Sequence, residues 1–334
     1  VHAFALDPER GLFILGILAF FIIGSLFIYS IKDFENETTP SYELTSKEFG
    51  FLLNNLLLVV LAVSILFGTI FPLIYEAITD GKQISVGAPY FEVILFPFAL
   101  ALGLLQGFAL YLSWGTSSSF KFLPRLLIES VSIFVLILII LFILFDNLHL
   151  TSFATIFLSS WILMGTLQIN KNKNLNYWRF LRKRAAVTFA HSGMAILTLG
   201  VAVVSSYSLE KEIILAPDDS VEFGNQTILF KNTEDIMGPN YFSKSATMSF
   251  SDGSNFSDVL TEKRTYSPSG QITTEAGIKT EIFQDLYISM GDNLEADIWS
   301  FKVQIKPFIR WIWLGALMIA IGSLLAGIKR VRKT

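Results

Sequence analysis

Long apolar runs, most of them without formal charge, alternate with shorter polar segments along most of this chain. Most of the runs are long enough for a helix to cross a bilayer, which needs about 20 apolar residues. The pattern therefore predicts a mostly α-helical membrane protein. We expect seven transmembrane helices, at Gly11–Ile31, Phe51–Tyr75, Val93–Leu112, Leu126–Phe145, Thr151–Gln168, Ala185–Ser206 and Ile309–Ile328.

A polar insert, roughly Leu209–Lys306, separates the last two runs. Its apolar residues alternate with polar ones at the period of a half-buried strand, most clearly from Trp299 to Ile305. Apolar segments flank Gly224–Asn225 and Asp252–Gly253, which is typical of hairpins. We expect a small β-sandwich or barrel that the membrane holds at both ends. The predicted domains are a six-helix bundle (1–206), the β domain (207–307) and a last helix with a basic tail (308–334).

Composition agrees with a membrane protein, because 52% of the 334 residues are hydrophobic and the mean hydropathy is +0.56. The chain has no cysteine, which excludes disulfides, thiolate metal sites and CxxC redox chemistry within it. It has three histidines, at positions 2, 149 and 191. Since it begins with Val1, we interpret it as a fragment or split subunit whose N-terminal part is absent.

Lysine and arginine are concentrated in alternate loops, which predicts an orientation by the positive-inside rule. The loops after the first, third and fifth runs and the tail after the seventh carry most of the cations, whereas the loops after the second and fourth carry only Lys82. The basic loops are therefore expected in the cytoplasm. His2, His149 and the β domain are expected outside, which in a Gram-negative bacterium is the periplasm.

His191 is the residue most suggestive of chemistry, because an ionisable side chain inside a membrane helix is a functional-site candidate. A neutral imidazole is a usual axial ligand of haem iron. The small residues at 190, 192, 193 and 200 would admit either a flat macrocycle or a second helix. An interhelical hydrogen bond is the competing interpretation, and the residues alone leave both open.

Other polar residues have structural explanations beside functional ones. Asn54, Asn55 and Gln106 would orient His191 through a hydrogen bond, or make ordinary helix contacts. Arg310, beside two tryptophans, is an interfacial anchor or a cation for a carboxylate such as a haem propionate. Taken alone, His2 and His149 are expected to be solvated.

Several functions find no support in the sequence. It contains no Walker A loop, no GxGxxG after a strand, and no HExxH or GxSxG motif. The orientation of the helices accounts for the basic loops, so a nucleic-acid partner is not needed.

A set of motifs, in order along the chain, resembles the C-terminal half of the CcmF family of cytochrome c maturation proteins. They are VHAFALDPERG (1–11), FLLNNLLLVV (51–60), VGAPYF (86–91), FAHSGMAILTLGVAVVSSYS (189–208), GPNY (238–241), LTEKRTY (260–266), DLYISMGD (285–292) and FIRWIWLGALMIAIG (308–322). Together they cover essentially the whole chain, including the β insert.

The resemblance implies a haem lyase component of the bacterial inner membrane that attaches haem to the CxxCH of apocytochrome c. It implies haem delivery by the chaperone holo-CcmE and thiol presentation by a CcmH-like protein. It also implies that His2 is an axial ligand of the substrate haem and that His191 is a ligand of a resident b-type haem. The partner ligands and the Trp-rich segment of the family lie in the upstream CcmF half, so the catalytic unit is incomplete without it. His149 gains no role.

Three alternatives compete with this interpretation. One is the paralogue dedicated to haem attachment in nitrite reductase. Another is a haem permease or secondary transporter, although no pair of broken helices in matching halves is evident. A non-catalytic scaffold, in which the β insert docks partners, is a third class.

Overall fold

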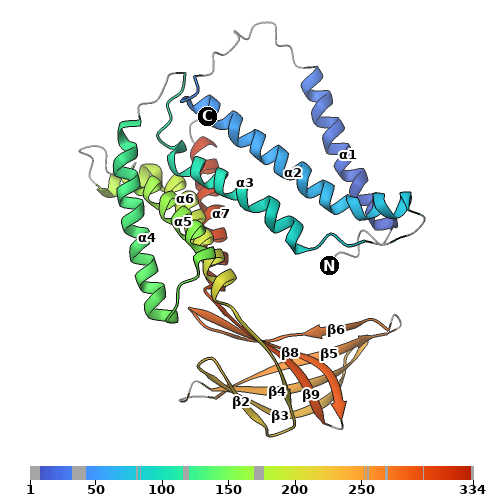
Figure 1. The fold of residues 1–334 in the computed structure, drawn as a ribbon. Helices are drawn as coiled ribbons and strands as arrows, with labels where there is room; N and C mark the ends of the chain where they lie inside the picture. The colour runs from blue at the N-terminus through green and yellow to red at the C-terminus, as the bar shows by residue number, and fades with distance from the viewer. Residues whose placement is uncertain are drawn as a thin grey trace. The chain divides into compact units, whose positions relative to one another are not determined.

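The computed structural model of this chain describes residues 8–31, 43–79, 82, 84–115, 120–168, 177–251, 253, 256–267, 270–295 and 297–331. This part of the chain contains seven helices that are long and apolar enough to cross a membrane, with a β domain between the sixth and the seventh (Figure 1). The predicted fold class is therefore confirmed. The chain forms two compact units, residues 1–124 and 125–334. His2 lies outside the described residues.

The first unit contains α1 (Pro8–Ser30), α2 (Lys47–Ile78) and α3 (Ala88–Ala109). Helix α3 begins five residues before the predicted Val93, so the end of the VGAPYF motif is helical and not a loop. Gly87 is the extended N-cap and Pro89 lies in the first turn, where its fixed φ favours a helix and its missing N–H costs nothing. The Tyr90 hydroxyl donates to the Ser64 carbonyl of α2 at 3.0 Å, which joins the two helices.

The second unit contains the rest of the membrane helices. These are α4, whose first two residues belong to the first unit (Leu123–Phe145), α5 (Phe153–Gln168), α6 (Tyr177–Tyr207) and α7 (Ile309–Val331). Helix α6 begins eight residues before the predicted Ala185, so the second half of the basic segment is helical. Arginine and lysine are good helix formers, and their long side chains can reach the membrane surface from within a helix. The basic residues therefore predict where α6 reaches the membrane surface, but they do not predict the residue at which the helix begins.

Helices α6 and α7 pack backbone to backbone through small residues. A Cβ atom added at Gly193 would lie 2.7 Å from the Gly315 carbonyl oxygen, and one at Gly322 would lie 2.6 Å from the Ala190 nitrogen. Farther along, a Cβ atom at Gly200 would lie 3.0 Å from the Ile312 nitrogen. In lipid, where apolar burial does not drive association, such close approach is what holds helices together.

The β domain is a sandwich of two antiparallel sheets. One sheet has the order β1-β9-β8-β7 and the other β2-β3-β4-β5-β6. The strands are β1 (Leu209–Leu215), β2 (Ser220–Phe223), β3 (Gln226–Met237), β4 (Tyr241–Ser251), β5 (Phe256–Tyr266), β6 (Ile272–Glu275), β7 (Gly277–Thr280), β8 (Gln284–Glu295) and β9 (Ile298–Pro307). Both predicted hairpins form, and Gly224 takes a φ of +60° in the first of them.

The core of the sandwich follows the alternation seen in the sequence. Trp299, Phe301, Val303 and Ile305 of β9 are all buried and face residues such as Phe230 on the opposite sheet. The Phe230 and Phe301 rings meet edge to face with centroids 5.0 Å apart. The expectation of a sandwich or barrel is thus resolved as a sandwich.

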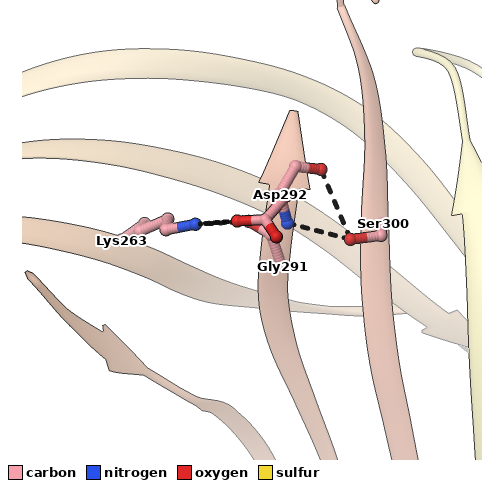
Figure 2. A network of polar contacts seen from close by, with 4 residues as sticks. All are labelled: Lys263, Gly291, Asp292 and Ser300. Carbon is pink, nitrogen blue, oxygen red and sulfur yellow. Dashed lines mark hydrogen bonds and ion pairs between the residues drawn. The ribbon is translucent and has the colours of Figure 1, made fainter. Parts of the chain in front are cut away.

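Polar contacts join the two sheets near the C-terminal end of β8, as Figure 2 shows. The Lys263 ammonium of β5 lies 2.6 Å from an Asp292 carboxylate oxygen and donates to the Gly291 carbonyl at 3.1 Å. The Asp292 backbone N–H donates to the Ser300 hydroxyl at 2.9 Å. The hydrogen bond from Lys263 lowers the pKa of the Asp292 carboxyl below its usual range. These contacts link β5 of one sheet to β8 and β9 of the other.

Candidate functional site

His191 lies near the middle of α6, and the two helices that pack against α6 define its surroundings. Helix α7 takes the side of α6 that carries Gly193 and Gly200. Helix α5 takes another side, where the Ser159 hydroxyl donates to the Ala195 carbonyl at 2.7 Å. At 100° per residue, His191 falls outside the strip facing α7 and within about 40° of Ala195, on the side of α6 that faces α5. Val187, one turn before His191, is exposed, so α5 does not cover this side of α6 along its whole length.

The small residues beside His191 thus serve helix packing. Ala190 and Gly193 both approach the α7 backbone, which settles their role in favour of a second helix over a flat macrocycle. The imidazole points elsewhere and is only partly buried. Its Nδ1 atom is buried and has no hydrogen-bond partner among the described residues. An orphaned ring nitrogen next to an open helix face fits a ring that receives a ligand or partner from outside the described contacts.

The predicted polar neighbours of His191 belong to the first unit. Asn54 donates to the Asn55 side-chain oxygen at 3.4 Å in α2, and Gln106 lies on α3. The Lys47 backbone N–H donates to the Ser113 carbonyl, so the start of α2 lies beside the end of α3. All three amides are within about two turns of that end. Their contact with His191, in the other unit, stays a prediction.

His149 is exposed, as predicted, in the connection between α4 and α5. Its ring meets Tyr207 edge to face with centroids 4.9 Å apart, and the Phe145 ring stacks on Tyr207 at 4.4 Å. Tyr207 ends α6, sixteen residues after His191, which is about 24 Å along a helix. His149 and His191 are therefore too far apart to bind one iron from its two sides. No group of three or more metal-ligating residues occurs in the described part of the chain.

Arg310 has a carboxylate partner within the chain. Its Nε atom donates to the Asp285 carboxylate at 3.1 Å, and the Asp285 side chain is 7% exposed. Asp285 was not among the site residues predicted from the sequence, although it is the first residue of the DLYISMGD motif. Its position becomes informative only once β8 is paired with β9, because that pairing places it near the start of α7. A propionate contact for Arg310 stays a prediction, and 44% of its side chain is exposed.

Comparison with known proteins gives consistent matches. Residues 206–307 match a family model described as the CcmF C-terminal beta-sandwich. The chain is 35% identical to the cytochrome c-type biogenesis protein ccl1 of Rhodobacter capsulatus, over 97% of this chain and 50% of that protein. It is 33% identical to the cytochrome c-type biogenesis protein CcmF of Pseudomonas aeruginosa, over 99% of this chain and 51% of that protein.

A solved structure shares the fold. It is named Cytochrome c Heme Lyase CcmF and matches with a TM-score of 0.69 at 20% identity, over 85% of this chain and 46% of that one. The chain therefore spans about half the length of the relatives that it matches.

Proposed function

Since the chain resembles the C-terminal portion of CcmF, as its motifs predict, we propose that it is a component of a cytochrome c haem lyase. In this proposal the complete enzyme holds haem while the thiols of an apocytochrome c CxxCH motif add across the two vinyl groups. The chain contributes one ligand to each of two haems, His191 to a resident b-type haem and His2 to the substrate haem.

The proposal rests on the surroundings of the His191 ring. Its Nδ1 atom is buried without a partner among the described residues, and α7 packs on a different side of α6. A polar nitrogen buried in this way costs about 1–3 kcal/mol unless it gains a partner. A haem that His191 holds through one ring nitrogen, with the other nitrogen hydrogen-bonded to an amide, would remove that cost.

The chain's own residues would bind and orient. His191 would hold the resident haem, which would supply a one-electron redox centre in the membrane. Asn54, Asn55 or Gln106 would hold the tautomer of its ring, and the exposed part of Arg310 would pair with a propionate. The arrangement favours positioning over acid–base catalysis.

The proposed location is the bacterial inner membrane, with the β-sandwich and His2 on the periplasmic side. The orientation is supported by the alternation of basic loops in the sequence. Substrate haem would arrive on that side from holo-CcmE, and a CcmH-like protein would present the apocytochrome thiols there. The segment equivalent to the upstream CcmF half would supply the partner ligands.

Substitution of His191 tests the proposal. The complete complex is purified from its native membrane as wild type, His191→Ala and His149→Ala, and its reduced absorption spectrum and haem content are measured. His191→Ala should lose the b-type spectrum and stop cytochrome c maturation, whereas His149→Ala should keep both. A b-type spectrum that survives His191→Ala, or a wild-type complex without stoichiometric haem, as a transporter would give, contradicts the proposal.

His2→Ala separates the two haem sites. It should keep the b-type spectrum and abolish thioether formation, and added imidazole should partly restore the reaction by occupying the vacant axial position. Loss of the b-type spectrum in this variant would contradict the assignment of two distinct sites.

A further inference from the structure

The turn between β7 and β8 exposes two adjacent large apolar side chains. Ile282 is 72% exposed and Phe283 is 60% exposed. A single exposed apolar residue is common on protein surfaces, but these two are adjacent, and Phe283 also belongs to a group of three aromatic side chains. The Phe283 ring lies 5.9 Å from the Phe308 ring and 6.4 Å from the Trp311 ring, centroid to centroid.

Strand register places this turn at the start of α7. In the β8–β9 pair, Gln284 lies opposite Pro307, the last residue of β9. Because the strands are antiparallel, the residues before Gln284 run alongside those after Pro307. Phe283 is thus level with Phe308, and Ile282 is level with the first residue of a helix that is long and apolar enough to cross a bilayer.

Backbone and side-chain bonds hold the turn in this position. The Phe308 N–H donates to the Phe283 carbonyl at 2.7 Å. The buried Asp285 carboxylate accepts from the Glu281 N–H at 3.2 Å and from Arg310 at 3.1 Å. One carboxylate therefore ties both the turn and the first turn of α7. The exposed pair is presented by a fixed element at the point where the chain enters the membrane.

We propose that residues 281–284 form a membrane-contacting tip, in which Ile282 and Phe283 enter the interfacial layer of the same bilayer that α7 crosses. We infer lipid as the partner because Phe283 contacts Trp311 of α7, and Leu314, three residues farther along the same side of that helix, is 46% exposed. Tryptophan and tyrosine gather at this depth of a bilayer, and an arginine there reaches phosphate groups. The tip gives the sandwich a lipid contact in addition to its two chain connections.

The absence of cysteine from the chain allows a direct test. A single nitroxide label is attached to Ile282→Cys in the full-length chain, in nanodiscs of phosphatidylcholine and phosphatidylglycerol. Collision of the label with oxygen, which concentrates in lipid, is compared with collision with a water-soluble nickel chelate. Leu317→Cys on the exposed face of α7 is the lipid reference.

Leu294→Cys is the matched water reference. Leu294 is also an exposed apolar residue of β8, but it lies ten residues along the strand from Gln284, about 30 Å away. It belongs to the end of the sandwich where Lys263 pairs with Asp292 (Figure 2).

We expect the ratio of oxygen to nickel collisions at position 282 to exceed that at position 294 at least threefold and to approach that at position 317. A ratio at position 282 equal to that at position 294 overturns the proposal, because the tip is then in water. A label that is immobilised and shielded from both reagents also overturns it, because protein then covers the tip. Since Ile282 is exposed, the label does not disturb the core.

Discussion

The contact between α6 and α7 allows a sharp prediction for Gly315. A Cβ atom at this position would lie 2.5 Å from the Gly193 carbonyl oxygen, 2.6 Å from the Leu197 nitrogen and 2.7 Å from the Leu197 Cβ. All three neighbours belong to the backbone or its first carbon, so no rotamer change relieves the overlap. An ordinary contact begins at 3.4 Å, so Gly315→Ala must separate the helices by about 1 Å.

Separation by this amount loses packing along the whole contact and not at one residue. A gap of about 1 Å forfeits up to half of each dispersion contact across it. Overpacking of this kind typically costs about 1–3 kcal/mol. We expect Gly315→Ala to unfold at a lower mole fraction of SDS than the wild type, by an amount that corresponds to this cost, with tryptophan fluorescence as the readout.

The same helix supplies a control, because a Cβ atom at Gly327 would meet nothing within 4 Å. Gly327→Ala should therefore unfold at or slightly above the wild-type midpoint. Gly193→Ala should resemble Gly315→Ala, and the double variant should cost less than the sum, because one separation relieves both overlaps. Equal midpoints for Gly315→Ala and Gly327→Ala would refute the reasoning.

Three further predictions concern the sandwich and its orientation. The Thr261 hydroxyl is buried and accepts from the Met290 N–H of the other sheet at 3.1 Å, so Thr261→Val should destabilise the sandwich by about 1–3 kcal/mol in thermal unfolding. A hydrogen bond from Arg264 holds the pKa of the Glu262 carboxyl below its usual range. This stabilisation is present above about pH 4.3, the usual glutamate value, and is lost as pH falls through the folded-state pKa. Glu262→Gln should therefore reduce the loss of stability as the pH falls from about 5 to about 2. Reporter fusions should give a periplasmic signal at Gly253 and a cytoplasmic signal after the last residue; the reverse pattern would contradict the proposed orientation.

Periodicity predicted the elements well because each has a single dominant pattern. Trp299, Phe301, Val303 and Ile305 alternate with polar residues and all point into the core. The predicted helix boundaries were less accurate where two signals compete. The sequence PYFEV at the start of α3 looks like a loop because of Pro89, yet proline in a first turn begins a helix.

The surroundings of His191 were not predictable from sequence for a related reason. The small residues at 190, 193 and 200 suit a helix or a macrocycle equally, and only the position of α7 decides between them. The pairing of Arg310 with Asp285 depends on the register of β8 against β9, over a separation of 25 residues. Local patterns carry no information about that register.

The connections of the sandwich explain why a further membrane contact matters. Helix α6 leads into β1 and β9 leads into α7, and β1 and β9 are neighbours in one sheet, with Leu209 opposite Ile305. Two adjacent strands give a base only about 5 Å wide, on which a domain tilts easily in the plane of its sheet. The β7–β8 turn lies on the other side of β9 and widens that base to about 12 Å. Tilt would then pull Ile282 and Phe283 out of lipid, so the hydrophobic effect itself would resist it. A sandwich held in this way would keep a fixed orientation toward any haem bound at the same membrane surface.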